Sequence, residues 1–141
     1  MDQEPAKISN PENFEKKNNS LIEEYGKLLW TTRVLSDLSM RSLFMGGPFT
    51  IWEKNKAIKK VNISLEKIQD LEKELFNEEA KKYDYIKYQF KNPWLEIFGG
   101  LLPRMLAKTS LKVDIDVLRL KIMKRHRELI DIRKMRRKKI H

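Results

Sequence analysis

Apolar side chains recur every three or four residues along most of the chain, which is the period of a helix with one buried face. In the first such stretch, residues 20–23 (Ser-Leu-Ile-Glu) have the form of an N-terminal capping box. Residues 46–48 (Gly-Gly-Pro) are expected to end this helix, because glycine favours the left-handed C-terminal cap and proline cannot continue a helix. The positions predicted to be buried are Leu21, Tyr25, Leu28, Thr32, Leu35 and Ser39.

A second stretch with the same period runs from about Ile51 to Phe90 and ends before Pro93. Such a helix would be about 60 Å long, which favours a coiled-coil-like hairpin. Residues 94–110 surround a second glycine pair and are interpreted as a short helix with an apolar turn. The last helix is predicted from about residue 110 to 138. Its buried face is predicted to hold Leu111, Ile115, Leu118, Ile122, His126 and Leu129.

Two short segments also fit a different structure. Residues 61–65 and 111–117 alternate apolar and polar side chains, which is typical of a half-buried strand. The helical period continues through both segments, and a lone two-stranded ribbon is only marginally stable. We therefore favour helix at both places, with strand as the alternative.

The whole pattern predicts an all-α fold: an elongated, antiparallel, coiled-coil-like hairpin or bundle of three to four helices. Residues 1–19 contain two prolines and four asparagines and are expected to form a poorly ordered lead-in, with a short turn of helix near Phe14 as the alternative. Residues 20–130 form the predicted helical body, with breaks near 46–48 and 92–103. Residues 131–141 form the predicted basic C-terminal helical extension.

Charge changes this picture at one end of the chain. The formal net charge is +10, and the first 103 residues hold 16 basic and 16 acidic side chains, whereas the last 38 hold 14 and 4. From Arg133 onward, arginines occupy positions where the buried face would continue, so we expect this end to leave the core. The residues that we expect to bind nucleic acid or another anion are Arg125, Arg127, Arg133, Lys134, Arg136, Arg137, Lys138 and Lys139.

Nucleic acid, and RNA in particular, is the anion that we expect at this end, because each neutralised phosphate releases counterions and arginine-rich segments are known to fold on RNA. The protein would recognise phosphate groups and the shape of the nucleic acid, since the sequence has no motif for base-specific contacts. The same basic run also fits a nuclear-localisation or solvated tail, and a contact with an acidic protein or an anionic membrane surface.

Apolar residues outside the predicted buried faces are a second feature that bears on function. The start of the last helix is apolar on two sides, and aromatic residues cluster near the breaks. Such residues either close the core where helices meet or form a partner interface, in which aromatic anchors are enriched. The residues assigned to a partner interface are Trp52, Trp94, Phe98, Val113, Val117 and Leu120.

The residue types needed for catalysis or metal binding are scarce. The chain has no cysteine and two histidines, of which His126 lies on the predicted buried face and His141 is the last residue. No Ser/His/acid or His-Glu-x-x-His arrangement can be assembled, and neither glycine pair matches a phosphate-binding loop. We therefore expect no enzymatic activity, no small-molecule substrate, no cofactor and no metal.

The N-terminal sequence indicates where the protein resides. Residues 1–5 (Met-Asp-Gln-Glu-Pro) lack the basic and apolar regions of a secretory signal peptide. The longest uncharged run, 42–52, has eleven residues, well below the roughly 20 that a membrane-spanning helix needs. We expect an intracellular protein of the nucleus, cytoplasm or mitochondrion.

Two functional hypotheses follow. The first is a non-enzymatic structural subunit of a larger assembly, such as a ribonucleoprotein or ribosome, that packs on other protein subunits and contacts phosphate through its basic C-terminus. The alternative is a coiled-coil scaffold or assembly factor of a protein complex, peripheral to a membrane or not, in which the basic tail serves targeting.

Overall fold

The fold was obtained as a computed structural model, and residues 11–44, 48–87 and 101–140 are described, without the side chains of 40–44, 48–51, 101–110, 139 and 140. Helix α1 spans Pro11–Phe44, α2 spans Pro48–Phe76 and α4 spans Leu101–Ile140. A short 3-10 turn, η1, covers Asn77–Glu79. The all-α prediction is confirmed, because these ranges contain helices and no strand.

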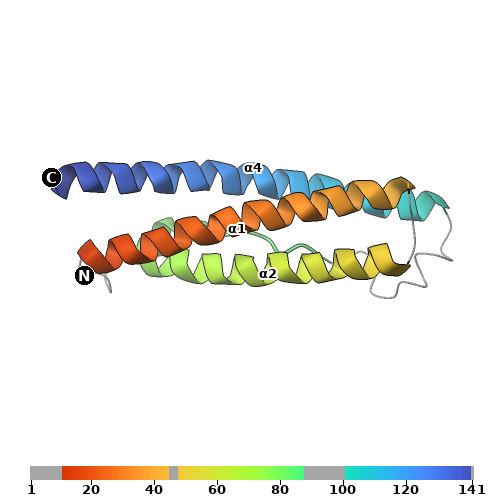
Figure 1. Cartoon of the computed structure of the whole chain (residues 1–141), viewed down its shortest axis with the longest axis horizontal. Coiled ribbons are helices and arrows are strands. Elements are labelled where there is room, and N and C mark those ends of the chain that lie inside the picture. The colour runs from red at the N-terminus through yellow and green to blue at the C-terminus, as the bar shows by residue number, and fades with distance from the viewer. Residues whose placement is uncertain (1–10, 45–47, 88–100, 141) are drawn as a thin grey trace.

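The three helices form an elongated bundle in which α1 packs against both α2 and α4 (Figure 1). Helix α1 runs antiparallel to both of its neighbours, so α2 and α4 run in the same direction. The break predicted at 46–48 is confirmed, since α1 ends at Phe44 and α2 begins at Pro48. The segments 61–65 and 111–117 lie within α2 and α4, so helix rather than strand is correct at both places.

The centre of the bundle follows a strict heptad pattern. Buried residues alternate at intervals of four and three in each helix, which is the spacing of a coiled-coil seam. All six positions predicted to be buried in α1 are buried. The corresponding positions are Ile58, Val61, Leu65, Ile68, Glu72 and Leu75 in α2, and Leu111, Ile115, Leu118, Ile122, Arg125 and Leu129 in α4.

The end of α2 differs from the prediction, which continued the helix to Phe90. The helix stops at Phe76, and Asn77 adopts a left-handed backbone with φ of 52°. Asparagine tolerates this conformation better than most residues. After η1 the chain is extended from Ala80 to residue 87 and runs back along the bundle (Figure 1). We call residues 80–87 the strap.

Side chains of α2 make hydrogen bonds to the backbone of the strap. Asn62 donates from Nδ2 to the carbonyl of Ile86 at 2.9 Å and accepts the Ile86 amide at 2.8 Å. The amide of Tyr83 donates to Gln69 Oε1 at 3.2 Å. Because buried backbone groups need partners, these amide side chains make an extended chain tolerable beside a helix.

Two other predicted boundaries are also wrong. Helix α1 begins at Pro11 rather than Ser20, so residues 11–19 are helical and not a poorly ordered lead-in; residues 1–10 lie outside the described residues. Proline fits the first position of a helix, and Phe14 packs against Phe76 with ring centroids 6.0 Å apart. Helix α4 begins at Leu101 rather than near residue 110, because Pro103 is tolerated in a first turn.

Candidate interaction surfaces

A buried polar cluster joins the three helices and the strap. The guanidinium of Arg125 donates twice to the Glu72 carboxylate, from Nε to Oε2 and from Nη2 to Oε1, each at 2.8 Å. The hydroxyl of Tyr25 donates to Glu72 Oε2 at 2.6 Å and lies 2.8 Å from the Tyr83 hydroxyl. Arg125 also lies over the Phe76 ring, 4.7 Å from its centroid.

Burial and the charges of this cluster shift the pKa values of its two tyrosines and of Arg125. Burial, followed by the negative charge of Glu72, raises the pKa of Tyr25 far above its ordinary value. Burial also raises the pKa of Tyr83 to about 12. Burial alone would lower the pKa of Arg125, but hydrogen bonds and attraction to Glu72 outweigh it and raise that pKa. Both tyrosines therefore remain neutral and Arg125 remains charged at neutral pH.

Arg125 is thus not available to an anion, contrary to the sequence prediction. Its side chain is 9% exposed and is neutralised by Glu72. The prediction placed His126 on the buried face between Ile122 and Leu129. A heptad pattern allows either position 125 or position 126 between these two residues, and the structure buries Arg125. The partner of Arg125 lies 53 residues away in α2, and no local pattern connects the two.

The C-terminal part of α4 also does not leave the core as predicted. Arg133 Nη1 donates to Asn19 Oδ1 at 3.2 Å, and Arg137 Nε donates to Glu15 Oε1 at 2.8 Å. The guanidinium of Arg136 stacks over Phe14, 3.9 Å from the ring centroid. These arginines hold the last turns of α4 against the first turns of α1, because the unpredicted start of α1 supplies their partners.

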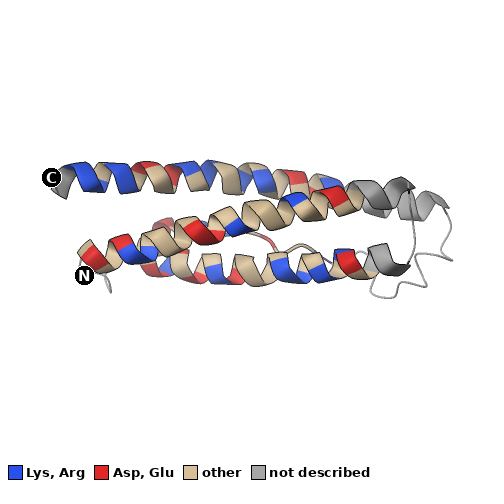
Figure 2. Ribbon diagram, in the orientation of Figure 1, with Lys and Arg blue, Asp and Glu red and all other residues tan. Residues whose placement is uncertain are grey.

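Other exposed cations lie on the side of α4 that faces away from α1, whereas Arg137 is exposed but paired with Glu15. Arg127, Lys134 and Lys138 of the predicted anion-binding set are exposed, as is Lys124, which was not in that set. Within the described residues these four side chains make no ion pair. Basic residues dominate this half of α4 in Figure 2. Lys139 is the remaining predicted member, and its side chain lies outside the described residues.

The other half of α4 exposes apolar side chains on the same outer face. Val113, Val117 and Leu120, all assigned to a partner interface, are 54%, 46% and 70% exposed. The strap adds Tyr85, which is about half exposed. Beside them, an open hollow of about 580 Å³ lies between the strap and α4, lined among others by Tyr85, Val117 and Lys121. We call the series Val113, Val117, Leu120, Lys124, Arg127, Asp131, Lys134 and Lys138 the α4 outer stripe.

Of the three aromatic members of the predicted partner interface, the structure describes only Trp52. Trp52 is half exposed on the first turns of α2, and Trp94 and Phe98 lie outside the described residues. Sequence reasoning missed Tyr85, because a continuous helix was predicted there. It also missed Trp30, a tryptophan of α1 that is 66% exposed. Trp30 lies outside the predicted buried positions of that helix, and this could have indicated its exposure.

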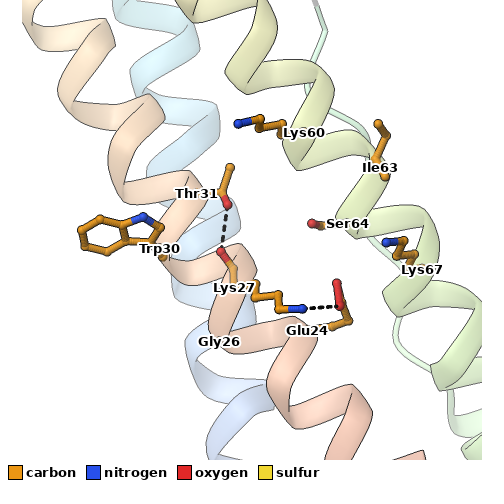
Figure 3. Close-up of a pocket in the computed structure, with 9 residues that line it drawn as sticks. All are labelled: Glu24, Gly26, Lys27, Trp30, Thr31, Lys60, Ile63, Ser64 and Lys67. Atoms are coloured by element: carbon orange, nitrogen blue, oxygen red, sulfur yellow. Dashed lines mark hydrogen bonds and ion pairs between the residues drawn. The ribbon is translucent and has the colours of Figure 1, made fainter.

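Trp30 stands at the edge of a groove between α1 and α2 (Figure 3). The groove is an open hollow of about 620 Å³. One bank, on α1, carries Gly26, Lys27 and Trp30, and the other, on α2, carries Lys60 and Ile63. Lys27 is held by two carboxylates of its own helix, at 3.8 Å and 3.7 Å.

His126 lies at the contact of α4 with α1. Burial lowers the pKa of this imidazole, and nearby Arg133 adds to the decrease, whereas a hydrogen bond to the backbone of Ile22 opposes it. The ring is therefore mainly neutral at pH 7 and acts as part of the helix contact. Within the described residues, no three or more His, Asp or Glu side chains gather closely enough to hold a metal ion.

Comparisons of the chain with models of protein families, with curated proteins and with solved structures found no match. None of the helices in the described ranges combines the length and the apolar character needed to cross a membrane.

Proposed function

We propose that this protein is a non-enzymatic helical subunit of a larger assembly, which docks on another protein through the α4 outer stripe. The observation that carries the proposal is the exposed apolar series Val113, Val117 and Leu120, continued by Tyr85 of the strap. Their spacing of four and three is the one that a helix uses to present an apolar face to a partner. A contiguous apolar patch of this kind is typical of protein–protein contact sites.

The basic half of the α4 outer stripe extends this surface toward a negative partner. Lys124, Arg127, Lys134 and Lys138 continue the same line along the helix, interrupted by Asp131. Apolar burial provides affinity, while charge complementarity steers association and fixes orientation. The proposed partner therefore offers an apolar groove with an acidic margin.

The experiment is co-purification of the full-length protein and its V117S/L120S variant from native extract. The variant exchanges two exposed apolar side chains for polar ones, so it should keep its helical circular dichroism signal while a partner protein is lost. Met135→Ser is the matched control, because Met135 is an exposed apolar residue of the same helix outside the patch. A partner retained by V117S/L120S, or lost equally from the control, contradicts the proposal.

A second candidate function is contact with nucleic-acid phosphate, most notably RNA in a ribonucleoprotein. It is favoured by the four exposed cations of the α4 outer stripe, which lack ion pairs within the described residues. Deleting residues 131–141 would not test it cleanly, because Arg133, Arg136 and Arg137 hold α4 on α1.

Substitution of only the exposed cations separates binding from folding. K124Q/R127Q/K134Q/K138Q should weaken single-stranded RNA binding and reduce the slope of log K against log salt by about 3, because each lost phosphate contact contributes about 0.7. The control K56Q/K59Q/K73Q/K82Q removes the same charge from α2 and the strap, where all four lysines are exposed. Equal losses in both variants would indicate a net-charge effect and contradict this candidate.

A further inference from the structure

The outward face of α1 carries a short series of side chains, of which Glu23 is ion-paired with Lys27 of the same helix at 3.8 Å. Glu23, Gly26, Trp30 and Arg33 follow one another at intervals of three, four and three, so they share one face of the helix. Glu23, Trp30 and Arg33 are exposed, and Trp30 projects outward beside the groove in Figure 3. We call these four residues the α1 outer stripe.

The shape of this stripe has a projection and a recess one helical turn apart. Trp30 is the projection, since its indole is 66% exposed. Gly26 is the recess: a side chain added at this position would meet nothing within 4 Å, and the 620 Å³ hollow opens beside it. A glycine inside a helix costs roughly 0.5–1 kcal/mol relative to alanine, so its presence here calls for a reason other than helix stability.

The charges of the stripe have opposite signs at its two ends. Glu23 lies at one end, where a second hollow is bordered by Asp70 and by the cations Lys27 and Lys67. Lys27 lies 3.8 Å from the Glu23 carboxylate. Arg33 lies at the other end and makes no ion pair within the described part of the chain. The stripe itself therefore has the acidic Glu23 at one end, Gly26 and Trp30 at its centre, and the basic Arg33 at the other end.

We propose that this surface binds the same surface of a second copy of the chain, with the two α1 helices antiparallel. A two-fold axis near the level of Leu28 brings Glu23 of one copy opposite Arg33 of the other. The same rotation sets Trp30 of one copy over Gly26 of the other, and each contact occurs twice. Two-fold interfaces require such self-complementarity, in which one patch meets itself.

The opposite charges of Glu23 and Arg33 favour a second copy as the occupant of this surface. The antiparallel copy brings Glu23 of each chain opposite Arg33 of the other, on both sides of the axis. A helix of a single charge sign would satisfy only one of these two residues. The surface lies on α1 and α2, apart from the α4 outer stripe, so this inference does not depend on the proposed function.

Sedimentation equilibrium of the full-length protein, from about 1 μM to about 1 mM, tests the dimer over a range that covers weak and strong association. A concentration-dependent dimer is expected. Trp30→Ala should raise its Kd by at least about thirtyfold, which is the threshold for an interface hot spot. Trp52→Ala is the matched control, because Trp52 is also a half-exposed tryptophan but does not line the groove. A protein that is monomeric throughout, including one whose groove binds an unrelated peptide, overturns the proposal.

Charge exchange tests the antiparallel geometry. E23R and R33E each place like charges opposite one another in the homodimer, so each single variant should be mainly monomeric. The double variant E23R/R33E has the net charge of the wild type and again pairs opposite charges in an antiparallel dimer, so it should dimerise. A double variant as monomeric as the single ones would rule out the proposed pairing.

A last variant separates loss of the dimer from loss of the fold. Gly26→Leu fills the recess with a good helix former, and a Cβ at this position meets nothing within 4 Å beyond the adjacent backbone of its own helix. It should therefore raise the Tm of the monomer while abolishing the dimer. A G26L protein that dimerises as the wild type does would show that Trp30 does not use this recess.

Discussion

The two ends of the bundle differ in what fills the positions that face its centre. At the end where both termini of the described chain lie, Tyr25, Glu72 and Arg125 occupy heptad positions and satisfy one another (Figure 1). Farther along, most of the corresponding positions hold aliphatic side chains such as Leu35 and Ile115, although Thr32, Ser39 and Lys54 are also buried there. The polar end depends on specific partners, whereas the apolar part depends on volume. This difference predicts how each responds to substitution.

The largest effect is expected from Glu72→Leu, which removes the buried counter-ion of Arg125 and leaves it only the partly exposed Glu128, at 3.3 Å. Breaking a buried pair by removing one member costs about 3–5 kcal/mol of unfolding free energy. The double variant E72L/R125M should recover most of that loss, since exchanging both charges for apolar groups is often neutral or stabilising. Urea denaturation measures both. Equal destabilisation by the single and the double variant would show that the pair is not the source of the cost.

A somewhat smaller effect is expected from Ile115→Ala in the apolar part of the bundle. Truncating a fully buried isoleucine costs about 2–5 kcal/mol through lost burial and the cavity left behind. Ile115 has no polar partner, so no second substitution comparable to Arg125→Met in the Glu72 variant is expected to restore the stability. Urea denaturation again measures the loss of unfolding free energy. A loss below about 1 kcal/mol would mean that the seam is less tightly packed than described.

Modest effects are expected where α4 meets the first turns of α1. Arg137→Ala removes an exposed ion pair with Glu15, and Arg136→Ala removes the stacking on Phe14. Each should cost no more than about 1 kcal/mol, since exposed ion pairs and cation–π contacts are weak. Hydrogen exchange of the amides near Phe14 should nevertheless accelerate in both variants. Unchanged exchange would mean that these arginines do not hold the start of α1.

The smallest effect concerns His126 and pH. Because burial lowers its folded-state pKa, the unfolded chain binds the proton more readily than the folded one. Stability should therefore be fully present above the unfolded-state value of about 6.5, decline as the pH falls below it, and level off beneath the folded-state pKa. Thermal denaturation at about pH 7.5 and about pH 5.5 should reveal this decline, and His126→Gln should reduce it. An identical decline in that variant would assign the effect to other groups.

The sequence predicted those features of the fold that depend on local period. The buried face of α1 and the break before Pro48 follow from spacing and from glycine and proline, and both are confirmed. The strap was missed because Tyr83 and Ile86 are three residues apart, an interval that also suits a helix. Their extended backbone depends on Asn62 and Gln69 of α2, which a local reading does not connect to them.

The charged sites were harder to predict than the fold, because identical side chains take different roles. Arg125 and Arg127 are two residues apart, yet one is buried against Glu72 and the other is exposed. Charged residues are seldom fully buried unless they are paired. Because the sequence does not reveal that Glu72 pairs with Arg125, both arginines are predicted to be exposed. The start of α1 was missed for a related reason, since the buried position that precedes Leu21 is the polar residue Asn18.

The contact between the first turns of α1 and the last turns of α4 also bears on how the chain can be reconnected. Glu15 and Arg137 are ion-paired although 122 residues separate them. A circularly permuted chain, with the natural ends joined by a flexible linker and new ends between Phe44 and Pro48, would keep every described helix intact. In that permutant the α1–α4 pairing becomes a contact between sequence neighbours. Since local contacts form faster than distant ones, the permutant should fold by a different order of helix docking to the same bundle.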